Sequence, residues 1–418
     1  MDTEHGQEQN QEKYSFMQES IKDEEVNGKK VLKKVAGLVG KGLLFGVAAS
    51  LGFFALKPWA ETIFQKDPNK VEIPQDDELE ETVQSEPEEV TSQVLTVEDY
   101  RDLNEVLIQV AAEAEKSVVL MTGIQQDEGW LTEQDSAAYQ TSGLIVADNG
   151  RELLILANYS DMKDAQLFQA KFADGSVHEA VMKQKDGNIN LAVFSVAKSS
   201  ISEKAWESIK VAELGNSNVL KQGRVMIALG SPFGVHGGIG YGAASSVDET
   251  INLADGQYDI LITDLPNAEK NSGILFDTYG RVMGIINHEL AKGNEVSTLT
   301  ALGISTIKSE IELMSNGKHV PYVGVHGTIV TEEISEVQNI PAGLYVTEVE
   351  VDSPAMKAGI QSGDVITEVS GKEITTYAEY HKAVIGQEAG KSIQVIGQRY
   401  GAEKYVGIKF NVTVGIKQ

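Results

Sequence analysis

The side chains able to do chemistry in this chain are hydroxyls, carboxylates, imidazoles and amines, because the chain contains no cysteine. A thiolate nucleophile, a disulfide and a cysteine-ligated zinc or iron–sulfur site are therefore excluded. A metal would have to be held by the seven histidines and the carboxylates, and their spacing is not typical of a metal site. No glycine-rich loop opens a helix after a strand in the manner of a phosphate-binding loop. We expect no metal and no cofactor.

Charge and composition limit the partners and the fold class. The 418 residues include 35 Lys and Arg against 62 Asp and Glu, a net charge of −27. Nucleic acids and anionic lipid surfaces are bound by clustered cations, so we expect no nucleic-acid partner. The length allows two or three domains of roughly 150 residues each. The 40 glycines against 9 prolines indicate many tight turns, which are typical of a mainly β protein.

Strand-like runs bounded by turn residues recur after residue 106. They cover 117–124, 142–147, 152–157, 166–172, 191–195, 224–229, 260–263, 281–286 and 302–304. The turns include Asp148-Asn149-Gly150, Asp174-Gly175 and Asp186-Gly187, since glycine accepts positive φ without steric cost. Helical periodicity is confined to 102–115 and 304–315, on either side of these strands. The spacing predicts a sandwich or barrel domain.

Residues 29–58 are predicted to form a transmembrane anchor. The apolar stretch 35–56 is long enough to cross a bilayer, which takes about 20 helical residues. Its one charged residue, Lys41, lies near the start and can reach the interface. Four lysines precede the stretch: Lys29, Lys30, Lys33 and Lys34. By the positive-inside rule they place residues 1–28, a polar tail predicted to be disordered, in the cytoplasm and the rest of the chain outside.

Two alternatives compete for this segment: a cleaved signal peptide, or an amphipathic helix buried in a soluble core. A cleaved signal has a shorter apolar core and ends in small residues, whereas this one ends in Leu56-Lys57-Pro58-Trp59 after a long charged region. The uncleaved anchor is favoured.

Residues 59–100 are predicted to be an acidic linker. The carboxylates between Asp76 and Glu89 have no cation beside them in the sequence, so self-repulsion favours an extended chain. A solvated spacer is favoured over a tether that binds a cation or a partner.

Three motifs in the strand-rich region carry a resemblance to a known family. They are Leu229-Gly230-Ser231-Pro232-Phe233-Gly234, then Thr263-Asp264 followed by Asn271-Ser272-Gly273, and Gly280-x-Val282-x-Gly284-Ile285. In this order they resemble the HtrA (Do-like) serine proteases, from about residue 117 to the C-terminus. The resemblance implies a trypsin-like double β-barrel over 101–318, followed by a PDZ domain over 319–418. It also implies assembly as a homotrimer.

The resemblance places the family's catalytic base and its supporting acid at two altered positions. The histidine of a pattern like I-L-T-N-N-H-V-V falls in 155–162, where Ser160 stands. The aspartate of D-L-A-V-L falls on Asn190, the first residue of Asn190-Leu191-Ala192-Val193-Phe194. An amide cannot stabilise an imidazolium as a carboxylate does. Both partners of the nucleophile are therefore predicted to be lost.

The nucleophile loop is also altered. The family shows G-N-S-G-G-P-L, and this chain has Lys270-Asn271-Ser272-Gly273-Ile274-Leu275, one residue shorter. Ser272 retains the nucleophile position. By the resemblance, Lys270 and Asn271 stand at the oxyanion hole, where Lys270 replaces a glycine whose N–H lines it.

These departures predict a proteolytically inactive family member, a pseudoprotease, because losing triad members costs on the order of 10⁶ in kcat. An active endopeptidase with a rearranged site is the alternative. Its base would be His178, His236 or His288, none of which sits in a recognisable site pattern, or Lys270 in a Ser–Lys pair. An exposed lysine, with a pKa of about 10, is protonated and cannot accept a proton.

Two further features are interpreted as structural. Asp264 is expected to be a turn or core-edge carboxylate rather than a specificity determinant. The glycine-rich run 237–242 is expected to be a hairpin between barrel strands.

The C-terminal hundred residues resemble a PDZ domain of the HtrA type. Ser353 and Pro354 are expected at the N-cap and first position of a short helix that Gly359 ends. A second helix is expected over 377–385 and strands near 392–398 and 404–411. By the resemblance, the carboxylate-binding loop consists of Tyr322, Val323, Gly324 and Val325.

PDZ domains bind an extended peptide by strand addition, while backbone N–H groups take its terminal carboxylate. The resemblance therefore implies that C-termini of peptides or unfolded proteins are partners. The alternative is a PDZ fold used only for packing or assembly. Tyr377, Glu379 and Tyr380 either shape the groove or lie exposed on the helix.

Together these features predict a membrane-anchored, proteolytically inactive HtrA-like protein of the bacterial envelope. Its C-terminal domains are expected outside the cell membrane, binding exposed C-terminal or misfolded segments in protein quality control or regulation.

Overall fold

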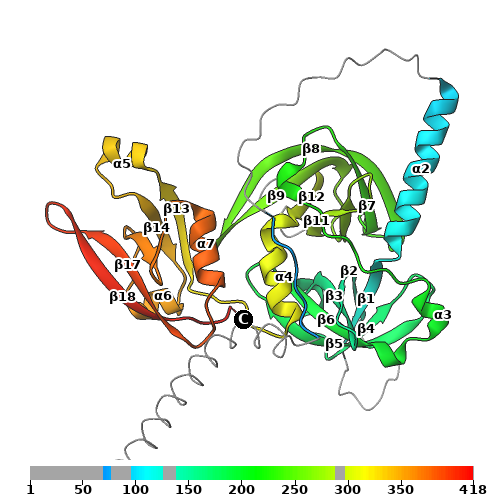
Figure 1. Cartoon of the computed structure of the whole chain (residues 1–418), viewed down its shortest axis with the longest axis horizontal. Helices are drawn as coiled ribbons and strands as arrows, with labels where there is room; N and C mark the ends of the chain where they lie inside the picture. Colours follow the sequence, from blue (N-terminus) through cyan, green and yellow to red (C-terminus); the bar gives the residue numbers. More distant parts are fainter. Residues whose placement is uncertain (1–68, 77–95, 126–137, 288–296, 418) are drawn as a thin grey trace, which may run out of the picture. The chain divides into compact units, whose positions relative to one another are not determined.

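The chain forms two closed six-stranded β-barrels followed by a further β-sheet (Figure 1). The computed structural model describes residues 69–76, 96–125, 138–287 and 297–417. The first barrel has the strand order β1-β2-β3-β6-β5-β4 and the second β10-β11-β12-β9-β8-β7. The mainly β class with a double barrel is therefore confirmed.

The first barrel takes its strands from residues 118–197. They are β1 (Val118–Ile124), β2 (Ala138–Asp148), β3 (Glu152–Asn158), β4 (Leu167–Lys171), β5 (Val177–Asp186) and β6 (Leu191–Ala197). The second barrel consists of β7 (Val225–Ser231), β8 (Gly238–Leu253), β9 (Gly256–Pro266), β10 (Ser272–Phe276), β11 (Val282–Asn287) and β12 (Thr298–Gly303). Each barrel has its own apolar core, and a third cluster of buried side chains includes residues of both barrels.

Helices flank the barrels, as the helical periodicity predicted. Helix α2 (Val97–Glu115) begins five residues earlier than expected, because Thr96 and Asp99 form a capping box there. The expected helix over 304–315 is a 3₁₀ turn (Ser305–Ile307) followed by α4 (Lys308–Ser315). A short helix α3 (Glu203–Trp206) follows the first barrel.

The glycine-rich run is mostly strand rather than turn. Strand β8 begins at Gly238, and residues through Gly242 pair with β7. A Cβ at Gly240 would lie 2.7 Å from the Phe233 ring, and one at Gly242 would lie 2.3 Å from Asp264 Oδ1. Glycine is thus needed for close packing here. Asp264 lies exposed within β9 rather than in a turn, and its Oδ1 accepts a hydrogen bond of 2.7 Å from the Ala243 amide.

Part of the expected acidic linker packs on the folded body instead of extending into solvent. Val71 and Ile73 are buried, and their amides donate to the side chains of Asn316 and Glu312. The Asp76 carboxylate forms an ion pair of 2.7 Å with Lys308 of α4. The sequence shows no cation near Asp76 because its partner lies more than two hundred residues away along the chain.

The third sheet contains six strands, and three helices accompany it. The strands are β13 (Val325–Val330), β14 (Gly343–Val349), β15 (Val365–Val369), β16 (Lys372–Glu373), β17 (Ser392–Tyr400) and β18 (Tyr405–Thr413). The helices are α5 (Glu332–Gln338), α6 (Pro354–Ala358) and α7 (Tyr377–Ile385). The cap at Ser353, Pro354 at the start of α6, the left-handed Gly359 after it and the span of α7 are all as predicted.

Within the described ranges, no helix is both long and apolar enough to cross a bilayer. The predicted anchor, residues 29–58, lies outside those ranges, as does the predicted cytoplasmic tail.

Candidate functional site

Ser272, the predicted nucleophile, is the first residue of β10 and is 5% exposed. It pairs with Ser231 on β7 and with Asn287 on β11, so its backbone is fixed from both sides. A nucleophile that attacks a peptide bond must be reachable by its substrate. This serine lies inside the contact between the two barrels.

The Ser272 hydroxyl is hydrogen-bonded to Ser142, on β2 of the other barrel. It accepts from the Ser142 amide at 2.9 Å and donates to the Ser142 hydroxyl at 3.2 Å. The Ser142 hydroxyl in turn donates to the Ser272 carbonyl oxygen at 3.2 Å. The proton of Ser272 is therefore directed at another hydroxyl, which is a poor base compared with an imidazole.

Two glycines allow close contacts around this serine pair: Gly230 faces Ser142 of the other barrel, and Gly273 faces the paired strand β7 of its own barrel. A Cβ at Gly230 would lie 2.5 Å from the Ser142 hydroxyl oxygen, and one at Gly273 would lie 2.4 Å from the Leu229 carbonyl oxygen. Gly230 of the 229–234 motif is thus explained by the close approach of Ser142.

The structure brings close together Ser160 and Asn190, the positions at which the resemblance predicts lost triad members. Ser160 begins the 3₁₀ turn after β3, and Asn190 precedes β6 with a left-handed φ of 57°. The Tyr159 amide, next to Ser160, donates to the Asn190 carbonyl at 2.8 Å. The Ser160 hydroxyl donates to Asn158 Oδ1 at 2.7 Å. The Ser160 side chain, at the position that the resemblance gives to the histidine, thus forms a local hydrogen bond within the turn.

The two expected oxyanion residues differ in their surroundings. Lys270 is exposed in the turn before β10. Asn271 is 1% exposed, and its Nδ2 donates to Asn267 Oδ1. Within the described part of the chain its buried Oδ1 has no hydrogen-bond partner.

Of the three alternative histidines, two are described. His178 Nδ1 contacts the Ser200 hydroxyl at 3.3 Å, and its Nε2 contacts Ser176 at 3.1 Å. Partial burial and the charge of Lys171 lower the pKa of the exposed His236. His288 lies outside the described residues.

The predicted carboxylate-binding loop, residues 322–325, holds a carboxylate. The Val323 and Gly324 amides donate to Asp255 Oδ2, each at 2.7 Å, and the Val325 amide donates to Oδ1 at 3.0 Å. Gly324 has a left-handed φ of 90°, and a Cβ there would lie 2.4 Å from Ser353 Cβ. The loop geometry that aims these amides at one point therefore requires glycine.

Asp255 lies at the tip of the hairpin between β8 and β9, in the second barrel. Its Oδ1 also accepts from the Tyr380 hydroxyl of α7 at 2.9 Å, and its own amide donates to the Val325 carbonyl at 2.8 Å. Burial raises the pKa of Asp255, while the three amides and Tyr380 oppose that shift. These four donors favour the carboxylate form.

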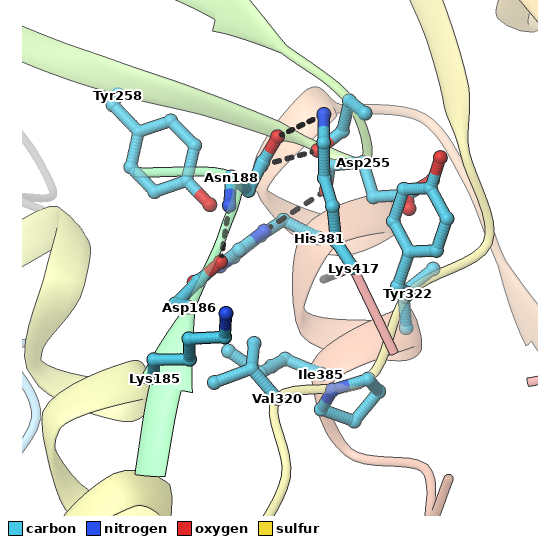
Figure 2. A pocket seen from close by; sticks show the side chains of 13 residues that line it. Lys185, Asp186, Asn188, Asp255, Tyr258, Val320, Tyr322, His381, Ile385 and Lys417 are labelled. Carbon is cyan, nitrogen blue, oxygen red and sulfur yellow. Dashed lines mark hydrogen bonds between the residues drawn. The ribbon is translucent and has the colours of Figure 1, made fainter. Parts of the chain in front are cut away.

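A buried ionic cluster lies beside this contact (Figure 2). His381 Nδ1 donates to the Asp255 carbonyl at 3.0 Å, and its Nε2 lies 3.0 Å from Glu310 Oε1. The Tyr258 hydroxyl donates to the same Glu310 oxygen at 3.2 Å. Burial lowers the pKa of His381, but Glu310 and Asp255 outweigh it and raise that pKa to about 9.

Asp186 is the second buried carboxyl of the cluster. The Asn188 amide donates to its Oδ1 at 2.7 Å, and within the described residues Oδ2 has no partner. Burial and the nearby charge of Glu310 raise the pKa of Asp186 to about 7. Lys417 reaches the same region, with Nζ 3.3 Å from Asn188 Oδ1 and 2.7 Å from Glu350 Oε1.

Sequence reasoning missed Asp255, Glu310 and His381. Asp255-Gly256 is typical of a hairpin turn and looks the same in sequence as Asp174-Gly175. Glu310 and His381 lie on two short helices, and no local pattern links them. Of the groove residues, the structure places Tyr377 and Tyr380 inward and buried, whereas Glu379 caps the helix.

Comparison with known families identifies both folded regions. Residues 141–285 match the trypsin-like peptidase domain, and residues 345–396 match the PDZ domain. The barrels with Ser272 at the contact between them, followed by the third sheet with its carboxylate-binding loop, thus define a trypsin-fold protein with a PDZ domain.

Curated relatives belong to the HtrA family, and a solved structure shares the fold. The chain is 27% identical over 286 residues to the serine protease Do-like HtrA of Lactobacillus helveticus, covering 64% of this chain and 67% of that one. It is 26% identical over 293 residues to the periplasmic serine endoprotease DegP of Escherichia coli K12, covering 69% and 60%. The solved HtrA-type protease AlgW with tripeptide matches with a TM-score of 0.54 at 20% identity, over 75% of this chain and 97% of that one.

The chain belongs to the HtrA family. It spans about two thirds or less of the length of the curated relatives named above.

The Ser142–Ser272 contact predicts that Ser272→Ala lowers the free energy of unfolding by about 1–3 kcal/mol, because the buried Ser142 amide loses its acceptor. Urea unfolding followed by tryptophan fluorescence measures the change. Ser231→Ala, the same change on the paired strand, is the control. An unfolding free energy unaltered in Ser272→Ala would contradict the contact.

The raised pKa of Asp186 predicts that stability falls as pH rises. A buried carboxyl with a folded pKa of about 7 stabilises the protein below its ordinary pKa of 3.8, and that contribution is lost as pH rises through 7. Asp186→Asn removes the titrating carboxyl. The free energy of unfolding therefore decreases less steeply between pH 4 and pH 7 in the variant, by up to about 1.4 kcal/mol per pH unit.

Urea unfolding at several pH values tests this expectation. The raised pKa of His381 acts in the same direction but over a higher window, through pH 9, and is expected to persist in the variant. Identical pH profiles for wild type and Asp186→Asn would contradict a raised pKa at Asp186.

Proposed function

We propose that this chain is a membrane-anchored, proteolytically inactive HtrA-like protein of the bacterial envelope. It binds exposed C-terminal or misfolded peptide segments through its PDZ domain, in protein quality control or regulation. The observation that carries the proposal is the Ser272 hydroxyl, which is buried and donates its proton to Ser142.

The chemistry of peptide hydrolysis needs more than this hydroxyl. Attack on a carbonyl requires a base that takes the serine proton and an oriented acid behind that base. Ser160 and Asn190 stand where the resemblance places these two groups, and neither is an imidazole or a carboxylate. Losing such partners costs on the order of 10⁶ in kcat, which leaves no useful turnover.

Peptide binding is supported from two sides. The PDZ match covers residues 345–396, and the solved AlgW structures are described as complexes with a tripeptide and a decapeptide. In this chain, three loop amides converge on one carboxylate, the group that a peptide C-terminus presents. The loop has the donors that such a ligand needs.

The proposed location rests on the sequence. The apolar stretch 35–56 with its preceding lysines supports a single-pass anchor in the cell membrane, N-terminus inside. The barrels and the PDZ domain then lie outside the membrane. Assembly as a homotrimer remains an expectation from the family.

The alternative function is that of an active serine endopeptidase with a rearranged site. The retained Asn271-Ser272-Gly273 sequence at the start of β10 favours it.

A proteolysis assay with fluorescently labelled casein decides between the two. The full chain in detergent is expected to release fluorescence at the rate of its Ser272→Ala variant, because the Ser272 hydroxyl donates to another hydroxyl instead of to an imidazole. DegP under the same conditions is the positive control. Turnover in the wild type that Ser272→Ala abolishes would refute the inactive protein and establish the endopeptidase.

A further inference from the structure

The end of the PDZ groove is occupied by this chain itself. Asp255 of the β8–β9 hairpin takes the three loop amides of residues 323–325 with both of its carboxylate oxygens. We propose that Asp255 is an internal ligand of the carboxylate-binding loop, which a peptide C-terminus must displace before it binds. This inference rests on the peptide-binding function proposed above.

The contact reproduces the way in which a peptide binds. In strand addition, a terminal carboxylate bonds to the loop amides and the ligand backbone bonds to the sheet edge. Here the carboxylate bonds are supplemented by the Asp255 amide, which donates to the Val325 carbonyl at the start of β13. The α7 wall contributes the Tyr380 hydroxyl to the carboxylate, and the Tyr377 hydroxyl donates to the Leu253 carbonyl at 3.5 Å.

An external carboxylate and Asp255 cannot occupy the loop together. All three amides are already bonded to Asp255, and a second carboxylate there would be a buried like charge without donors. Ala254 is 1% exposed and Asp255 5% exposed. The space remaining beside them is about 20 Å³, which holds about one water.

Further contacts hold the hairpin in place. His381 of α7 donates to the Asp255 carbonyl (Figure 2). The same His381 forms an ion pair with Glu310 of α4, the helix that follows the barrels. Asn188 of the first barrel donates to the Ala254 carbonyl at 2.7 Å and accepts from Lys417. Release of Asp255 therefore separates ionic groups as well as the loop bonds, which makes the occupied loop the resting state.

The backbone conformation of Asp255 determines which substitutions can test the proposal. Its φ of 59° lies in the left-handed region, which glycine adopts without strain and asparagine tolerates. Asp255→Gly removes the carboxylate and keeps the hairpin geometry. Asp255→Asn keeps the size of the side chain and removes its charge. Asp248→Ala is the matched control, because Asp248 is an exposed carboxylate on β8, the strand that leads into the hairpin.

The experiment measures peptide binding to the full chain in detergent by fluorescence anisotropy. The probes are labelled decapeptides that differ in their last residue, each made with a free C-terminal carboxylate and as a C-terminal amide. We expect the best free-carboxylate peptide to bind Asp255→Gly about tenfold or more tightly than the wild type, because the apparent Kd is inversely proportional to the fraction of molecules whose loop is open. Asp255→Asn is also expected to bind this peptide more tightly than the wild type. The amide peptides should gain no affinity for either Asp255 variant, and Asp248→Ala should bind as the wild type does.

A second readout separates the two proposals. Hydrogen exchange of the fragment that covers 320–328 should be slow in the wild type and faster in Asp255→Gly. Equal peptide affinity in wild type and both Asp255 variants would overturn the internal ligand and leave the peptide-binding function standing. Failure of every peptide to bind any variant, with faster exchange in Asp255→Gly, would refute the peptide-binding function and show a loop held by Asp255 for packing alone.

Discussion

One hydrogen-bonded pair, Ser142 with Ser272, joins the two barrels at the position where the resemblance places the family's nucleophile. Both serines are buried, so each polar group must find a partner inside the protein. Three hydrogen bonds join the two residues, so the Ser142 amide, both hydroxyls and the Ser272 carbonyl each have a partner. A Cβ at Gly230 would collide with Ser142 across this contact, whereas one at Gly273 would collide with Leu229 of the paired strand β7. The arrangement directs the Ser272 proton to the hydroxyl of Ser142.

The same requirement explains the carboxylate-binding loop. Three amides that point to one place are costly to bury unless an acceptor meets them, and a buried carboxylate is costly unless donors surround it. The loop and Asp255 meet both needs at once, with Tyr380 as a fourth donor. The predicted nucleophile, Ser272, and the predicted carboxylate-binding loop, residues 322–325, are thus both hydrogen-bonded to groups of this same chain. The two contacts differ in their surroundings: each of the two serines lies within a strand of a closed barrel, whereas Asp255 sits at a hairpin tip.

How much of the fold and of the candidate site could be predicted from the sequence depended on how far apart in the chain the interacting residues lie. The cap of α6 by Ser353 and Gly359, the span of α7 and most barrel strands follow from local turn and capping signals, and the structure has them where expected. The positions of Ser160 and Asn190 beside each other followed from the resemblance. Asp255, Ser142 and the ion pairs of Asp76 and His381 did not, because each partner lies far away in the chain. A buried aspartate in a hairpin has the same sequence signature as an exposed one, and only the fold decides which it is.

The central claim, that Ser272 is not a nucleophile, is tested most directly by its reaction with a fluorophosphonate, which modifies activated serines. The full chain is treated with the probe beside DegP, and the fragment that contains Ser272 is weighed by mass spectrometry. The account predicts an unmodified fragment under conditions that label DegP fully. Stoichiometric phosphonylation of Ser272 would contradict it.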